Sequence, residues 1–156
     1  MGDVEFYSAT LYRYAVVDLE KLLENLQGDK ELALKGALAF LKAFALTLPS
    51  GKQNSFAAHN PPLFVAFRAG VGLPRNLATA FEKPVQPRPD APLSRLSAEA
   101  LLKEWEKFDR FFGPLDPEWK GALDLTEVGG SGLPRLGSLE DFRAEAEKAL
   151  KALLEV

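Results

Sequence analysis

One polar stretch of the chain carries side chains that could hold a phosphate group. Residues 49–51 have the sequence PSG, which predicts the end of a helix and a turn. Lys52, Gln53 and Asn54 follow directly and supply a cation and two amides. Donors of this kind, placed beside free backbone N–H groups, are typical of phosphate binding. The alternative is an ordinary solvated loop between a helix and a strand.

The charge distribution favours the same part of the chain. The net charge is −3, which argues against a free-standing nucleic-acid-binding domain. Residues 1–48 carry five bases and seven acids, and residues 91–156 carry nine bases and thirteen acids. Residues 49–90 carry five bases and only two acids. An anionic partner is therefore expected at this middle segment.

Several kinds of chemistry have little support in the sequence. The chain has no cysteine and a single histidine, His59, which excludes disulfides and a His/Cys metal cluster. Glu104 and Glu106 lie on a predicted helix, and Glu140 and Asp141 lie at the start of another, where acids favour the helix dipole. We therefore expect no enzyme activity and no cofactor. A ribonuclease that uses His59 as its base is the catalytic alternative.

The length of 156 residues suits one domain, spanning 1–156. No apolar run is long enough for a signal peptide or a membrane span, so we expect a cytoplasmic protein without a membrane partner. Residues 4–17 are rich in Val, Tyr, Phe and Thr and predict a central strand, apolar on both faces. Arg13 interrupts that apolar pattern. The ordinary interpretation is that its aliphatic stem packs against the core while its guanidinium reaches water.

The remaining elements follow from capping residues, breakers and apolar spacing. Residues 86–92 form a proline-dense connector, and residues 75–85 fit either a short helix or an irregular edge. Asp18 and Asp29 are expected to cap the first two helices, Ser97 the third and Ser138 the last. The expected helices are 19–28, 30–48, 98–112 and one starting after Ser138, and the expected strands are 55–59, 63–69 and 121–128.

This order of elements predicts an α+β fold. A strand, a helical crossover, a hairpin, a helix and a strand are typical of ferredoxin-like folds, including the RRM platform. We expect an antiparallel sheet with its helices packed mainly on one face. The opposite face would then be open to another layer or to a ligand.

Four groups of residues carry a resemblance to a known family: EFYS at 5–8 with LYRYA at 11–15, DL at 18–19 with ENL at 24–26, PSGKQNSFAAHN at 49–60, and LATAFEKPV at 77–85. These stretches resemble the backbone subunit (CasC) of the type I-E Cascade complex of CRISPR immunity. The order and spacing of these stretches fit the family over roughly residues 3–85. Residues 86–156 fit the family only in their general layout and share no matching stretch with it.

The resemblance implies a non-catalytic, modified RRM-like palm, incomplete here because the match begins partway through the family's chain. Copies of the family protein polymerise on a CRISPR RNA (crRNA), grip its backbone and present its bases to target DNA beside other Cascade subunits. Lys52 and Gln53 become the leading candidates for contact with the RNA backbone, with Arg13 and Asn54 behind them. Lys83 and Arg88 become candidates that face target DNA.

Two further points stay open at the level of the sequence. Glu82 and Asp90 weaken the basic character of the stretch that holds Lys83 and Arg88. Tyr12 could stack on a base, although an aromatic residue on a two-sided strand is more often part of the core. The alternative function is a protein-interaction module that contacts neighbouring subunits without touching nucleic acid, as the acidic ends and the expected open sheet face suggest.

Overall fold

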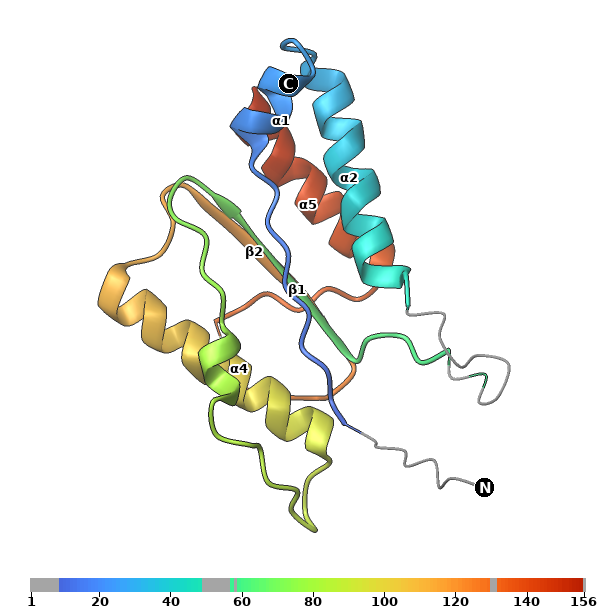
Figure 1. Ribbon diagram of the computed structural model, residues 1–156, viewed down its shortest axis with the longest axis vertical. Coiled ribbons are helices and arrows are strands. Elements are labelled where there is room, and N and C mark those ends of the chain that lie inside the picture. Colours follow the sequence, from blue (N-terminus) through green and yellow to red (C-terminus); the bar gives the residue numbers. More distant parts are fainter. Residues whose placement is uncertain (1–8, 49–56, 58, 130–131, 156) are drawn as a thin grey trace, which may run out of the picture.

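A two-stranded antiparallel sheet lies at the centre of the molecule (Figure 1). The computed structural model describes residues 9–48, 57, 59–129 and 132–155. Strand β1 spans Phe64–Gly70 and strand β2 spans Glu118–Asp124, with Ala66 opposite Ala122. The apolar run that predicts β1 is confirmed. β2 begins three residues earlier than predicted and ends at Asp124, whose carboxylate accepts the Thr126 N–H at 2.8 Å and so forms a turn.

Helices cover both faces of this sheet. Successive residues of β1 point to opposite faces. On one face, Phe64 and Ala122 pack against α4, which spans Leu93–Phe112. On the other face, Phe67 meets Phe142 of α5, Leu139–Leu154, edge to face with ring centroids 5.2 Å apart. The α+β class with an antiparallel sheet is confirmed. The expectation of an open sheet face is wrong, because α4 covers it.

Two further helices pack on α5, so most helices lie on one side of the sheet, as predicted. Helix α1 spans Leu19–Asn25 and helix α2 spans Lys30–Leu46 (Figure 1). Asp18 and Asp29 cap them, and each carboxylate accepts a backbone N–H at 2.9 Å. The leucine spacing predicts both helices correctly. Their shared cluster is Ala33, Leu34, Leu38 and Leu154, with Leu19, Leu22, Leu23, Leu26 and Leu150 packed around it.

The two C-terminal helices start differently from one another. The prediction that Ser97 caps α4 is wrong, because the helix begins at Leu93, five residues before the predicted start and directly after Pro92. Ser97 is buried inside the helix, and its hydroxyl donates to the Leu93 carbonyl at 2.7 Å. The Ser138 cap of α5 is confirmed: its hydroxyl oxygen accepts the Asp141 N–H at 3.0 Å.

The predicted strand over residues 4–17 is wrong for its described part. Residues 9–17 form no ladder, and the segment is tied to its surroundings chiefly through side chains of Tyr12 and Arg13. Residues 4–8 lie outside the described part of the chain. Of the predicted strand 55–59, only Ala57 and His59 are described, and neither is in a strand.

The undecided segment 75–85 contains a short 3-10 helix, η1, spanning Ala78–Phe81. It packs against α4. The connector 86–92 is a loop, as predicted, closed by a bridge between Arg88 and Ala91. None of the helices in the described ranges is both long and apolar enough to span a bilayer.

Candidate nucleic-acid interface

Tyr12 joins the N-terminal segment to the segment around η1. Its hydroxyl donates to the Asn76 Oδ1 atom and accepts the Leu77 N–H, both at 3.2 Å. Its ring lies against Phe81 with centroids 5.4 Å apart. Burial raises the pKa of the Tyr12 phenol, and the hydrogen bond from the Leu77 backbone partly offsets this rise. Two stretches of the CasC resemblance, more than 60 residues apart, therefore meet here.

Arg13 joins the same N-terminal segment to the end of α2. Its Nη1 atom donates to the Thr47 carbonyl at 2.9 Å, and its guanidinium lies 4.6 Å from the centre of the Phe44 ring. Thr47 is the C-cap of α2, so the cation complements the negative end of the helix. Arg13 is exposed and pairs with no carboxylate among the described residues. Its positive charge is therefore still presented to solvent at the C-terminal end of α2.

The other predicted contacts are scattered or lie beyond the described ranges. Lys52, Gln53 and Asn54 lie outside the described residues, so their roles stay predictions. Lys83 is exposed just after η1. Arg88 is also exposed, and its Nε atom lies 3.9 Å from a carboxylate oxygen of Asp90. This acid offsets part of the charge that Arg88 would present to DNA.

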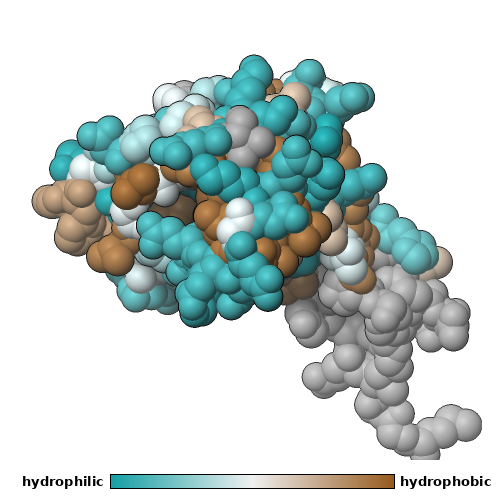
Figure 2. Space-filling view, turned by 90° about the horizontal axis from the view of Figure 1, so that it is seen from above, coloured by the Kyte–Doolittle hydropathy of each residue, from teal (hydrophilic) through white to brown (hydrophobic). Residues whose placement is uncertain are grey.

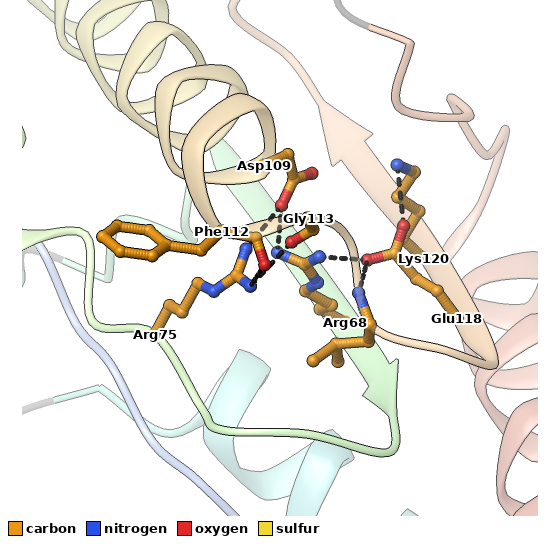
Figure 3. A network of polar contacts seen from close by, with 8 residues as sticks. Arg68, Arg75, Asp109, Phe112, Gly113, Glu118 and Lys120 are labelled. Atoms are coloured by element: carbon orange, nitrogen blue, oxygen red, sulfur yellow. Dashed lines mark hydrogen bonds and ion pairs between the residues drawn. The ribbon is translucent and has the colours of Figure 1, made fainter.

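A polar network links α4 to both strands (Figure 3). It contains two bases of the segment 49–90, where the charge distribution predicts an anionic partner. Asp109 of α4 pairs with Arg68 of β1 at 2.7 Å and with Arg75 at 2.8 Å. Arg68 also pairs with Glu118 of β2. The side chains of Arg68 and Arg75 are only 14% and 17% exposed. Neither guanidinium is presented to solvent as a free charge.

This network corrects the interpretation of the positive middle segment. The acids of the network come from residues 91–156 and its two arginines from residues 49–90. A count of charges along the chain therefore does not reveal that these groups neutralise each other in the fold. Glu118 shows the effect: burial opposes its ionisation, but the Lys120 hydrogen bond at 2.9 Å and the Arg68 charge lower its pKa overall. Among the described bases of residues 49–90, Lys83 and Arg88 remain as surface charges.

The structure adds partners that the sequence did not single out. Asn76 accepts from Tyr12 and from the Ala78 N–H at 3.0 Å, so it orders the start of η1. Thr47 supplies the carbonyl for Arg13. An asparagine two residues before a short helix is a local capping signal, but its contact with Tyr12 depends on the fold. His59 is exposed, and the described residues contain no group of three potential metal ligands.

Removing the Tyr12 hydroxyl should loosen this junction. We expect Tyr12→Phe to lower the free energy of unfolding by about 1 kcal/mol, because the Asn76 and Leu77 groups lose a partner. Urea unfolding of both proteins measures the difference. Tyr14→Phe is the control, since no described hydrogen bond uses the Tyr14 hydroxyl. Equal losses for the two variants would contradict the assigned role of Tyr12.

Comparison with known proteins places this chain in a family. The model of the CT1975-like protein family, Cas_CT1975, matches residues 1–142. The chain belongs to this family. No curated protein sequence matches the chain.

Two solved structures resemble this CT1975-like chain in fold. A chain of a "CRISPR RNA-guided surveillance complex, pre-nicking" superposes with a TM-score of 0.75 and 25% identity over 86% of the present chain. A chain of a "CRISPR RNA-guided surveillance complex" superposes with a TM-score of 0.65 and 26% identity over 89% of it. The present chain spans 36% and 50% of their lengths. The predicted resemblance is thus confirmed for a Cascade-type Cas protein, while type I-E CasC stays a prediction.

Proposed function

We propose that this CT1975-like chain belongs to a crRNA-binding backbone subunit of a Cascade complex, equivalent to CasC of type I-E. The subunit grips the guide through its phosphates and not through its bases, and it helps the complex to hold target DNA. It is non-catalytic, needs no cofactor and works in the cytoplasm. Its partners are crRNA, target DNA, further copies of itself and other Cascade subunits.

The observation that carries this proposal is the superposition on a surveillance-complex chain with a TM-score of 0.75. Arg13 supports it from the site: an exposed guanidinium without a described carboxylate partner lies at the C-terminal end of α2, and Lys52 follows that helix in the sequence. A point charge beside backbone donors attracts phosphate irrespective of base sequence. Lys52, Gln53 and Asn54 are proposed to extend this contact, and Lys83 and Arg88 to face the target strand.

Replacing Lys52 tests the backbone contact. In the protein as it occurs in the cell, we expect Lys52→Ala to weaken guide RNA binding and to reduce the slope of log K against log salt by about 0.7, the value for one phosphate contact on a single strand. Binding is measured at several salt concentrations. Lys35→Ala is the matched control, because Lys35 pairs with Glu31 on the outer surface of α2. An unchanged affinity and slope would remove Lys52 from the site.

The alternative, a protein-interaction module without nucleic-acid contact, is favoured by one observation. Large apolar side chains are exposed at the end of α4, where Phe111 and Phe112 are 68% and 71% exposed. Exposed apolar groups of this size are typical of protein interfaces. Purification from cells separates the two functions. Nucleic acid that co-purifies supports the first, and a protein partner without nucleic acid supports the second.

A further inference from the structure

One connector carries both bases that are proposed to face target DNA, Lys83 and Arg88. We call it the 82–92 connector. It runs from the end of η1 to the start of α4, at the lower edge of the molecule in Figure 1. Both side chains are exposed. A base on a segment that is already held in place loses less conformational entropy when it binds a phosphate, so whatever holds this connector affects the contact.

Helix η1 determines where the connector begins, and it has few hydrogen bonds of its own. The Ala80 N–H donates to the Leu77 carbonyl at 3.0 Å. The Glu82 N–H donates to the Thr79 carbonyl at 3.3 Å. A single helical turn of this kind is marginal in water without tertiary contacts. The position of η1 therefore depends on side chains from other segments.

The first of these side chains is that of Tyr12. Its hydroxyl accepts the Leu77 N–H at 3.2 Å, directly before η1. Its ring lies against Phe81, the last residue of η1, with centroids 5.4 Å apart. Lys83 follows Phe81 by two residues. Tyr12 therefore contacts both ends of η1, including the end from which the connector leaves.

The second side chain is that of Glu104, on α4. Its Oε1 atom accepts the Thr79 hydroxyl, from the middle of η1, at 2.9 Å. The same oxygen lies 3.3 Å from the Lys107 ammonium, and the Glu104 side chain is only 14% exposed. The carboxylate is therefore held on α4 itself. Together with Tyr12 it ties η1 to two separate parts of the fold.

We propose that Tyr12 and Glu104 are positioning residues for target-DNA binding. They hold η1, and η1 holds the 82–92 connector where Lys83 and Arg88 reach the DNA phosphates. This inference rests on the proposed function, because it needs a guide-loaded complex that holds target DNA. Arg13 is held separately, by the Thr47 carbonyl at 2.9 Å, so removing the Tyr12 hydroxyl leaves the proposed guide contact in place.

The exposed apolar side chains that favour a protein partner lie away from this connector. Helix α4 ends at the left of Figure 1, whereas the connector is at the lower edge. Figure 2 shows apolar atoms at the left of the view, on the side where α4 ends. Phe111 and Phe112 are the large exposed apolar side chains at that end. Substitutions at the two contacts of η1 therefore leave this apolar surface unchanged.

Target-DNA binding by the full-length protein, assembled with a guide RNA and the other subunits of its complex, tests the inference. The probe is a single DNA strand complementary to the guide, measured at several salt concentrations. The anchor variant combines Tyr12→Phe with Thr79→Val. We expect it to bind the strand about tenfold more weakly and to lower the salt slope by up to about 0.7, as for one lost phosphate contact. Its guide affinity should equal that of the wild type.

Three further variants separate positioning from a general loss of stability. Asp18→Ala removes the N-cap of α1, which should cost similar stability without changing the affinity for the strand. The connector variant, Lys83→Ala with Arg88→Ala, removes the bases themselves. In that background the anchor substitutions should have no further effect on strand binding. Tyr12→Phe alone, which keeps the ring beside Phe81, replaces the anchor variant if the latter does not fold.

The outcomes distinguish this inference from the function on which it rests. A wild-type complex without guide RNA would overturn the proposed function, and this inference with it. With guide bound, three results would each overturn the inference alone: wild-type affinity of the anchor variant for the strand, an equal loss of affinity in Asp18→Ala, or a further loss of the same size when the anchor substitutions are added to the connector variant.

Discussion

Replacing Phe142 with alanine is expected to lower the free energy of unfolding by about 4 kcal/mol. Phe142 is 1% exposed and is the largest fully buried side chain of the described residues. It stands edge-on to Phe67, so it joins α5 to the sheet. Its removal leaves a cavity that helix and sheet must either keep or close by shifting. Urea denaturation of both proteins gives the difference.

The matched control for this change is Phe40→Ala. Phe40 is 44% exposed on α2 and stacks only on Phe44 among the described aromatic rings. Its loss should cost no more than about 1 kcal/mol. A Phe142 variant that loses as little as the Phe40 variant would show that α5 does not depend on this contact to cover the sheet.

Removing the Asp109 carboxylate is expected to cost about 3 kcal/mol. The substitution Asp109→Ala leaves two largely buried guanidinium groups, Arg68 and Arg75, without a shared partner. Breaking a buried ion pair from one side typically costs 3–5 kcal/mol. The lower end applies because Arg68 keeps Glu118 and Arg75 keeps its hydrogen bond to the Gly113 carbonyl at 2.7 Å. Equilibrium unfolding in urea measures this loss.

A surface pair provides the control for Asp109. Asp90 lies 3.9 Å from Arg88, and both side chains are exposed. We expect Asp90→Ala to change stability by less than about 0.5 kcal/mol. A double-mutant cycle of Asp109→Ala with Arg75→Ala should show a coupling of at least about 1 kcal/mol. No coupling, with an Asp109 loss as small as that of Asp90, would mean that the network does not hold α4 to the sheet.

Local signals predicted the helices well. Asp18, Asp29 and Ser138 each provide a capping oxygen where a helix begins, and these contacts depend only on residues three positions apart. The start of α4 was missed because its N-cap is Pro92, which has no side-chain oxygen that could mark a helix start in the sequence, and the helix begins without a side-chain cap hydrogen bond. Ser97 instead bonds within the helix.

Long-range pairing limited the rest of the prediction. Residues 9–17 have a strand-like composition, but a strand also needs a neighbour with matching hydrogen bonds, and composition does not supply one. The prediction drawn from the positive charge of residues 49–90 failed for a similar reason. Arg68 and Arg75 lie in a basic stretch, yet their partners Asp109 and Glu118 come from the acidic C-terminal third.

The roles of the predicted interface residues stay predictions. The structure places the Arg13 guanidinium at the C-terminal end of α2, where it donates to the Thr47 carbonyl. It also brings Tyr12 to Leu77, a contact between two stretches of the CasC resemblance. The roles of Lys52, Gln53 and Asn54 rest on sequence alone. The burial of Arg68 and Arg75 narrows the surface bases of the described middle segment to Lys83 and Arg88.

The most direct test of guide binding is size-exclusion chromatography of the protein co-expressed with a guide RNA. Absorbance at two wavelengths reports protein and nucleic acid in the same peak. We predict that RNA elutes with the protein for guides of unrelated sequence, because the phosphates carry the contact. A protein peak free of RNA for every guide, or retention of one guide sequence alone, would contradict this account.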